Sequence, residues 1–429
     1  MATGEPSRDV FRAPKGTRDV LPPESDRWID VIGRFADRAR RFGYGLVVTP
    51  MFEHYEVFAR LGDSTDVVSK EMYDFTDKGD RRLALRPEGT AGAVRAFVEH
   101  RPTPPWKVWY VAPNFRYERP QAGRYRQHFQ IGAEVIGSDD PLIDVEMIDL
   151  IAGFYRELGL ERVRLVINSM GDAPSRSAYR DVLLDYWRAN RAVLGDEIAR
   201  AELNPLRILD SKRPDWQPMI GAAPRLADHL NDQSTETFAS VREGLEAIGI
   251  EYTIEPRLVR GFDYYTATVF EFQGLALEGA QNGIGGGGRY DRLAEEMGGP
   301  PAPAIGFGSG IERILLALDA ESTAPSAAAA SRTIDAYIVD GLGSLAATTL
   351  VHELREQGIA TDRAYGGRSL KKQWGAADKS GARFGVMLAP REFAEGRVVV
   401  KELATGLQSE VPIGEIADHI RRQSGVSSS

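Results

Sequence analysis

The sequence of 429 residues contains no cysteine and only six histidines. The absence of cysteine excludes disulfide bonds, a thiol nucleophile and cysteine-ligated zinc or iron–sulfur sites. Six scattered histidines argue against a histidine-rich metal centre. There is no apolar run of about eighteen residues, and the N-terminus lacks the apolar core of a secretory signal. We therefore expect no membrane span and a cytoplasmic protein.

The charge of the chain is acidic overall, but two segments are locally basic. There are 53 basic and 62 acidic residues, a net charge of −9, which argues against a protein that coats DNA. Residues 116–126 hold four arginines against one glutamate, and residues 363–383 hold six basic residues against one aspartate. Such runs are most often solvated faces, but two basic patches also fit selective binding of an anionic partner.

The clearest domain boundary is the segment Ala320–Ser331, whose small and mostly uncharged residues are typical of a linker. After it, predicted strands and helices alternate, which favours an α/β domain with a largely parallel sheet. The expected strands are Ile334–Val339, Ile359–Ala364 and Phe384–Leu388, and the expected helices are Leu345–Glu356 and Ser369–Lys379.

The larger N-terminal part predicts an α+β body. One helical face is formed by Trp28, Ile32, Phe35, Ala39 and Phe42, with Gly43 as the stop. Strands are expected at Gly45–Thr49, Leu83–Leu85, Trp106–Ala112, His128–Ile136 and Tyr264–Phe272. The short connections between several of them predict hairpins, which favours an antiparallel sheet. Residues 175–248 have a mostly helical pattern, so we expect an inserted helical subdomain.

The strand His128–Gly137 carries the first candidate site. Its odd-numbered residues are apolar, whereas Gln130, Gly132 and Glu134 point to the opposite face. An amide and a carboxylate with a bare glycine between them leave room for a small ligand. The alternative is an exposed sheet face.

Two further segments combine charged and hydroxyl side chains. Residues 86–90, Arg-Pro-Glu-Gly-Thr, place Glu88 and Thr90 at a turn where they could bind an ammonium group, but alone this pattern favours a helix N-cap at Thr90. Residues 260–265 join Arg260 to Tyr264 and Tyr265. Adjacent strand residues point to opposite faces, so only one of these tyrosines can line a given pocket unless the strand is irregular.

The glycine-rich segments indicate close backbone approach. Residues 283–291 contain GxGxxG, but no acid follows at the distance that a dinucleotide-binding fold needs. We therefore exclude a nicotinamide-dependent oxidoreductase and expect the glycines to admit a ligand or another strand. In residues 306–313, alternate glycines leave one strand face free, and Arg313 in the first helical turn opposes the helix dipole. This unfavourable position of Arg313 has two explanations. Either an anionic ligand binds near Arg313, or Glu312 or solvent screens its charge.

Taken together, these segments resemble the class II aminoacyl-tRNA synthetases, and among them the histidyl-tRNA synthetase family. Residues 41–53, 115–118 and 306–313 are similar to motifs 1, 2 and 3 of the class. The histidine-specific signatures are stronger, and they are LVRGFDYY at 258–265, GGRYD at 287–291, RPEGT at 86–90 and KGTRDVLP at 15–22. Their order and spacing cover nearly the whole chain.

The resemblance implies a class II antiparallel sheet with helices, a helical insertion and a C-terminal α/β anticodon-binding domain. It implies a catalytic domain over residues 1–325 with the insertion at about 172–250, then a linker and anticodon-binding domain over 326–429. It also implies a homodimer formed through motif 1.

The resemblance further implies a role for each candidate residue. Histidine's amino group would be held by Glu88, Thr90 and Gln130, its imidazole by Glu134 and Tyr265, and the pocket would be lined by Tyr264 and Tyr290. The α-phosphate of ATP would contact Arg116 and Arg260, the catalytic residues, and the outer phosphates would contact Arg313. Contacts with tRNA would come from Arg119, Gln121, Arg124, Lys371 and Lys372.

The implied activity joins histidine to tRNA(His), with ATP as substrate and Mg²⁺ held by one or two carboxylates that the sequence does not identify. Two rivals share part of the pattern. A regulatory subunit of ATP phosphoribosyltransferase usually lacks the C-terminal domain and loses an Arg or Tyr from the RGxDYY segment, yet Arg260, Tyr264 and Tyr265 are all present. Prolyl- and threonyl-type synthetases share the C-terminal domain type but not the histidine signatures.

Overall fold

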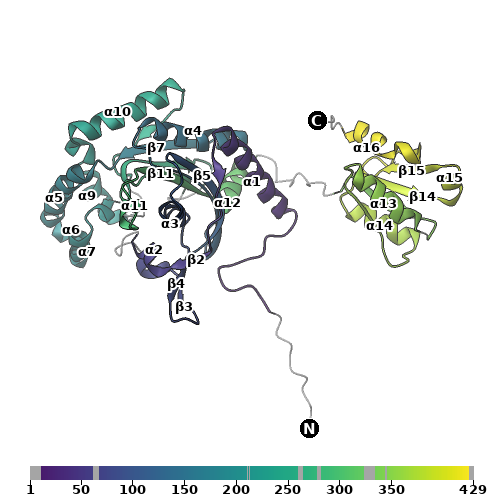
Figure 1. Cartoon of the computed structure of the whole chain (residues 1–429), viewed down its shortest axis with the longest axis horizontal. Coiled ribbons are helices and arrows are strands. Elements are labelled where there is room, and N and C mark those ends of the chain that lie inside the picture. The colour runs from purple at the N-terminus through teal and green to yellow at the C-terminus, as the bar shows by residue number, and fades with distance from the viewer. Residues whose placement is uncertain are drawn as a thin grey trace, which may run out of the picture. The chain divides into compact units, whose positions relative to one another are not determined.

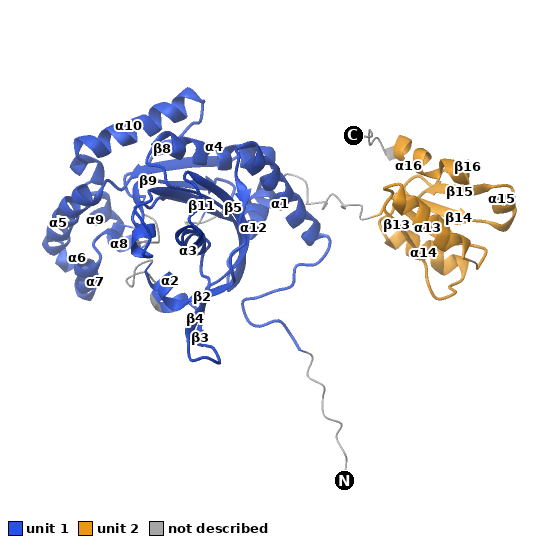
Figure 2. Ribbon diagram, viewed as in Figure 1, with its two compact units in different colours: residues 1–325 blue, residues 326–429 orange. Residues whose placement is uncertain are grey.

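The computed structural model describes residues 11–60, 67–209, 211, 213–258, 264–277, 282–322, 334–343 and 345–424. The chain divides into two compact units, residues 1–325 and 326–429 (Figure 2). The expected linker lies outside the described residues from Thr323 to Ser331, and Glu321 before it still belongs to a helix. Within the described part of the chain, no helix combines the length and apolar character that crossing a membrane requires.

The first unit is built on a mostly antiparallel sheet, which the described residues form with eight strands. In sheet order these are β1 (Gly45–Leu46), β5 (Trp106–Phe115), β6 (Gln127–Ile136), β11 (Ala304–Gly310), β10 (Gly283–Arg289), β9 (Thr266–Gly274), β7 (Val163–Ser169) and β8 (Thr253–Ile254). Only the edge pairs β1–β5 and β7–β8 run parallel. The expected strand at Gly45–Thr49 is therefore only two residues long.

One face of this sheet carries the larger apolar core. It packs against the helices α1 (Glu24–Arg41), α4 (Leu142–Glu157), α10 (Asp232–Ala247) and α12 (Ile311–Glu321). The predicted face of the first helix is confirmed, because Trp28, Phe35 and Ala39 are buried in this core and the helix ends just before Gly43, whose φ is +79°. The apolar residues of β6, Ile131, Ala133 and Val135, belong to the same core.

The opposite face of the sheet holds α3 (Thr90–His100), around which the sheet curves in Figure 1. A small sheet of β2 (Phe52–His54), β4 (Arg82–Leu85) and β3 (Asp74–Thr76) adjoins it, with α2 (Tyr55–Ala59), the π-helix Val67–Glu71 and α11 (Leu293–Glu296). This face also carries the cluster of buried tyrosines described below.

A helical segment interrupts the sheet between β7 and β8 and lies on the left in Figure 1. Its helices before α10 are α5 (Ala173–Ala189), α6 (Arg191–Leu194), α7 (Ile198–Leu203), α8 (Leu206–Leu209) and α9 (Gln217–Gly221). Asp172 and Asn231 cap α5 and α10 by accepting the backbone N–H groups of Ser175 and Ser234 at 2.9 Å. Buried Leu183 and Trp187 join the segment to the core on the α3 side of the sheet.

The second unit is an α/β domain. Strands β13 (Thr361–Arg363), β12 (Ala336–Asp340) and β14 (Phe384–Leu388) pair in parallel, as the alternation predicted, and α13 (Ala346–Glu356) and α14 (Leu370–Lys379) lie between them in sequence. The sheet continues with an antiparallel hairpin that the sequence analysis did not predict. It consists of β15 (Arg397–Glu402) and β16 (Gln408–Pro412), with α15 (Pro390–Ala394) before it and α16 (Ile416–Ser424) after it.

Candidate active site

Glu134 lies at the centre of a buried polar cluster on the α3 side of the sheet. Its side chain is fully buried and accepts hydrogen bonds from three hydroxyl groups. Thr90 donates to Oε1 at 2.8 Å, Tyr110 donates to Oε1 at 3.0 Å, and Tyr290 donates to Oε2 at 2.5 Å. The alternation along β6 therefore brings this carboxylate into a pocket rather than onto an exposed sheet face.

A second carboxylate, Glu88, lies beside the first at the start of α3. It accepts the backbone N–H groups of Thr90 at 2.6 Å and Ala91 at 2.7 Å. Glu88 thereby performs the capping that the sequence analysis assigned to Thr90, since the helix begins at Thr90 and the Thr90 hydroxyl is directed to Glu134 instead.

Burial controls the ionisation of both carboxyl groups. It raises the pKa of Glu134 to about 8, against the smaller lowering effect of its hydroxyl donors, and Glu88 nearby raises it further. Burial also raises the pKa of Glu88, while its backbone donors act in the opposite direction. The pocket is therefore rich in acceptors that gain most from a ligand carrying N–H groups or positive charge.

Alternate glycines on β11 make space for these side chains. Gly306 pairs with Glu134, and a Cβ atom there would lie 1.5 Å from Glu134 Oε2. Gly308 faces Gln130, and its Cβ would lie 1.8 Å from Nε2. Asn114 on β5 donates to Gln130 Oε1 at 2.7 Å and fixes which way the amide points. The free strand face that the sequence predicted is thus occupied by two candidate ligand-binding side chains.

The adjacent tyrosines 264 and 265 lie on the same side of the sheet. Their ring centroids are 4.6 Å apart, and both residues are 9% exposed. Tyr290 meets Tyr264 edge-on at 5.7 Å. The exception that the sequence analysis allowed applies here, because β9 begins at Thr266 and its alternation does not extend back to these two residues.

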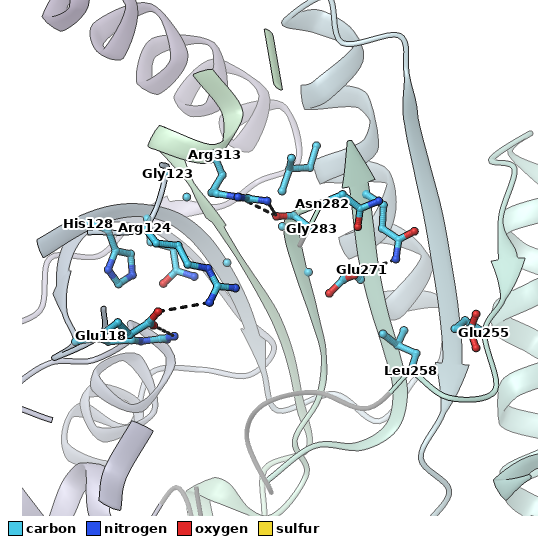
Figure 3. A pocket seen from close by; sticks show the side chains of 18 of the residues that line it. Glu118, Gly123, Arg124, His128, Glu255, Leu258, Glu271, Asn282, Gly283 and Arg313 are labelled. Atoms are coloured by element: carbon cyan, nitrogen blue, oxygen red, sulfur yellow. Dashed lines mark hydrogen bonds and ion pairs between the residues drawn. The ribbon is translucent and has the colours of Figure 1, made fainter. Parts of the chain in front are cut away.

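An arginine-lined cavity of about 700 Å³ adjoins the tyrosine cluster, with Gln130 in its wall. Arg116 donates to the Pro87 carbonyl at 2.8 Å, and Arg313 donates to the Gly283 carbonyl at 3.1 and 3.2 Å. Figure 3 shows Arg313 reaching Gly283 and Arg124 directed toward Glu118, the latter an ion pair of 3.4 Å. Burial lowers the pKa of Arg313, and Arg124 lowers it further. An anionic ligand in the cavity would relieve this crowding of cations.

The remaining candidate residues lie at three different places. Arg260 lies outside the described residues, which stop at Leu258 and resume at Tyr264. Arg119, Gln121 and Arg124 are exposed on the connection between β5 and β6, and Arg124 also lines the cavity. In the second unit, Lys371 and Lys372 are exposed on α14.

The structure adds residues that the sequence analysis missed. Tyr110 is one, and the space for its ring is left by Gly89 and Gly132, which are close to it only in the folded chain. His128 is another. It lines the cavity in Figure 3, and burial together with Arg116 lowers its pKa to about 3, so that its imidazole is neutral. Asn114, fully buried beside Gln130, has no sequence signal beyond its place on a strand.

Comparisons with known proteins agree with this geometry. The family model described as "Histidyl-tRNA synthetase" matches residues 16–314, and the one described as "Anticodon binding domain" matches residues 343–423. A histidine–tRNA ligase of Rhodococcus erythropolis is 49% identical over 96% of this chain and 97% of its own length. One of Corynebacterium urealyticum is 47% identical over 98% of this chain and 99% of its own length.

Among solved structures, the apo histidyl-tRNA synthetase of S. aureus is 34% identical and superposes with a TM-score of 0.79 over 96% of this chain and 100% of that one. A Bacillus halodurans protein described as an ATP phosphoribosyltransferase regulatory subunit/histidyl-tRNA synthetase is 23% identical and shares the fold alone, with a TM-score of 0.62 over 85% of this chain. The expected fold class, an α+β body with a mostly antiparallel sheet and an α/β anticodon-binding domain, is confirmed. The full-length relatives, the matching family model and the buried site together establish that this chain belongs to the histidyl-tRNA synthetase family.

Proposed function

We propose that this chain is a histidine–tRNA ligase that works in two steps. The carboxylate of L-histidine attacks the α-phosphorus of ATP, which forms histidyl-adenylate and releases pyrophosphate. A terminal ribose hydroxyl of tRNA(His) then attacks the carbonyl carbon, which forms the ester and releases AMP. The observation that carries the proposal is the buried carboxylate Glu134, with its three hydroxyl donors, next to an arginine-lined cavity.

The buried cluster is proposed to bind histidine. Glu134 and Tyr265 hydrogen-bond the two imidazole nitrogens, and Glu88, Thr90 and Gln130 hold the amino group. Tyr264 and Tyr290 line the pocket. Buried polar groups that only the correct side chain can satisfy discriminate by roughly 10⁴–10⁵, so no separate editing site is needed.

The arginine-lined cavity is proposed to bind ATP. Arg116 and Arg260 neutralise the charge that gathers on the α-phosphate, and Arg313 holds the outer phosphates. The planar fork of arginine suits phosphate oxygens and is preorganised for the transition state.

Mg²⁺ is proposed as the counterion of the phosphates. No cluster of three or more acidic or histidine side chains suited to a metal ion occurs in the described part of the chain, but Glu118 and Glu271 each line the cavity. Mg²⁺ bound to a nucleotide needs only one or two carboxylates, so these residues fit it.

The tRNA is proposed to contact both units. Residues 1–325 form the catalytic domain with the insertion at about 172–250, and 326–429 form the linker and anticodon-binding domain. Arg119, Gln121 and Arg124 contact the acceptor end, and exposed Lys371 and Lys372 contact phosphates near the anticodon.

We also propose that the chain works in the cytoplasm as a homodimer. The segment around β1 and β2 supports dimerisation, since it exposes a row of apolar side chains that a monomer would leave in water. Their exposed fractions are 58% for Leu46, 84% for Val48, 54% for Met51 and 52% for Phe52.

The test is ATP–pyrophosphate exchange with each of the twenty amino acids, without tRNA. We expect exchange with histidine alone, followed by charging of tRNA(His) transcripts in a second assay. Exchange with no amino acid would refute the proposal and favour the phosphoribosyltransferase regulatory subunit, for which binding to the catalytic subunit is the next measurement.

A further inference from the structure

A buried ion pair lies behind the sheet, on the side away from the tyrosines. Arg289 Nη2 and Asp144 Oδ1 are 2.7 Å apart, and their side chains are 3% and 0% exposed. Arg289 also donates to the carbonyls of Ser138 at 2.8 Å and Asp140 at 2.7 Å. One guanidinium thus joins the end of β10 to the segment that leads into α4.

Arg289 occupies an irregular position in the sheet. It is the last residue of β10, and the pairing of β10 with β9 shifts register between Gly288 and Arg289. A register shift of this kind re-aims the side chains next to it. The residue that follows is Tyr290, whose hydroxyl donates to Glu134 at 2.5 Å on the opposite side of the sheet.

The Tyr290 backbone continues directly from the paired end of β10, where Arg289 pairs with Ile305 of β11. Its N–H donates to the Ala304 carbonyl at 2.8 Å, and the neighbouring Asp291 accepts from the Thr266 hydroxyl at 2.7 Å. Besides this pairing and the contact of the Tyr290 ring with Tyr264, the Arg289 guanidinium holds the end of β10 from which that ring projects. Neither Arg289 nor Asp144 lines the arginine-lined cavity.

We propose that Asp144 and Arg289 are positioning residues for recognition of the amino-acid side chain. From behind the sheet they set the direction from which Tyr290 donates to Glu134, and so the orientation of the carboxylate toward an imidazole. The inference rests on the proposed histidine pocket, and it assigns these residues to histidine binding rather than to ATP binding.

The experiment measures KM for histidine and for ATP separately in pyrophosphate exchange, with the full-length chain. The main variant is the double substitution Asp144→Leu with Arg289→Met, because it replaces both charges of the buried pair by apolar groups. Asp291, whose Oδ1 lies 3.7 Å from Arg289 Nη1, keeps the hydrogen bond from Thr266. Arg289→Lys is the second variant. It keeps the charge opposite Asp144 but lacks the fork that reaches both carbonyls at once.

We expect the double variant to raise KM for histidine at least tenfold and to leave KM for ATP within twofold. Arg289→Lys should shift the same constant in the same direction by less. An unchanged KM for histidine in either folded variant overturns the proposal, as does a parallel rise of both KM values. If the double variant does not fold, Arg289→Lys decides by the same criteria.

Tyr290→Phe supplies the decisive comparison. If the pair acts through the Tyr290 hydroxyl, adding Arg289→Lys to Tyr290→Phe should change KM for histidine less than it does in the parent chain. Fully additive effects would count against the proposal, since they mean that Arg289 acts independently of the hydroxyl.

Arg38 is the matched control for a merely structural effect. It is another buried arginine that reaches α4, and it forms ion pairs with Glu157 at 2.8 Å and Asp149 at 3.1 Å, so its nearest partner lies five residues beyond Asp144 on that helix. Arg38→Met should lower the melting temperature and leave KM for histidine unchanged.

If the parent chain fails to exchange with histidine, the proposed function fails. Normal exchange by the parent together with an unaffected Arg289→Lys variant rejects the positioning role alone.

Discussion

At the scale of single residues, the site depends on Glu134, a carboxyl group whose burial costs free energy. Glu134 has no exposed surface, and its three hydroxyl donors are neutral groups rather than cations. Desolvation is therefore only partly offset. A ligand that brings an N–H group to this carboxylate recovers part of that loss, and we therefore expect the residue to discriminate among amino acids.

We predict that Glu134→Ala lowers kcat/KM for histidine in pyrophosphate exchange by at least about 10³-fold, because it removes the imidazole acceptor. Glu134→Gln keeps the shape and one acceptor oxygen, so a smaller loss is expected. Circular dichroism and thermal melting check that both variants are folded. Exchange at the parent rate in a folded Glu134→Ala variant would show that Glu134 does not bind the histidine side chain.

Much of the site was predictable residue by residue, and the misses have physical causes. Period-two alternation placed Gln130 and Glu134 on one face correctly, because the middle of β6 is regular. The same rule does not apply to Tyr264 and Tyr265, because the strand expected to begin at Tyr264 begins at Thr266. Tyr110 was missed because its role depends on glycines that are close in space but distant in sequence.

At the scale of elements, the site is held by strand pairing between β6 and β11. The glycines of β11 allow Glu134 and Gln130 to lie across the neighbouring strand. The sequence predicted the free face of this strand, and also the antiparallel body, because hairpin spacing and alternation are local signals. It did not predict β7 or the β15–β16 hairpin, although residues 163–167 (VRLVI) and 397–401 (RVVVK) are rich in β-branched residues. Their places in the sheets depend on pairing, because β7 pairs with β9, which is distant in sequence, and β15 pairs with β14 in an otherwise parallel sheet.

We predict that Gly306→Ala lowers the rate of histidine-dependent pyrophosphate exchange by about 10²-fold. Moving a binding group such as Glu134 by about 1 Å has an effect of this size. The new Cβ would overlap Glu134 Oε2 and approach the Ala133 carbonyl at 2.9 Å. The control is Gly33→Ala in α1, where no atom lies within 4 Å, and helix propensity predicts a gain of about 0.5–1 kcal/mol in stability with unchanged exchange. Normal activity of Gly306→Ala would contradict the close packing of these strands.

Glu312 links two further elements and gives a prediction about pH. It lies in the first turn of α12, and its carboxylate accepts the Phe129 N–H of β6 at 3.0 and 3.2 Å. Burial raises its pKa to about 7, with Arg18 lowering it and Glu24 raising it by smaller amounts. A pKa raised in the folded state stabilises the fold below about pH 4.5, and this contribution is lost as pH rises through 7.

The free energy of unfolding of the parent chain should therefore fall relative to that of Glu312→Gln between pH 4.5 and 7.5, by about 3 kcal/mol. Urea unfolding at a series of pH values measures this difference. Because Gln keeps an acceptor for the Phe129 N–H, the comparison isolates ionisation. A difference that does not change with pH would mean that Glu312 keeps its ordinary pKa.

At the scale of the whole molecule, the chain forms two compact units, and we expect them to divide the work on one large substrate. Adenylate formation is expected to need only the first unit, whereas tRNA is expected to contact both. The sequence predicted this division because the linker composition and the change from an antiparallel to an alternating α/β pattern both mark it. Two linked binding surfaces raise affinity by roughly 10²–10⁴ without any new contact at either one.

Deleting residues 332–429 should therefore lower the efficiency of tRNA charging by at least about 10²-fold, while pyrophosphate exchange with histidine falls by less than about threefold. Both rates are measured on the same preparation. An equal loss of both would show that the second unit supports the catalytic unit rather than the tRNA.

The second unit should also determine how charging responds to salt. Lys371→Ala with Lys372→Ala removes two exposed cations from α14 and should raise KM for tRNA without affecting exchange. Each phosphate contact releases counterions, so the slope of log KM against log salt should fall by about 1–2 in the double variant. Arg391→Ala is the control, because its 85% exposed side chain lies on α15 of the same unit. An unchanged slope in the lysine variant, or an equal change in the control, would place the tRNA contact on another face of this unit.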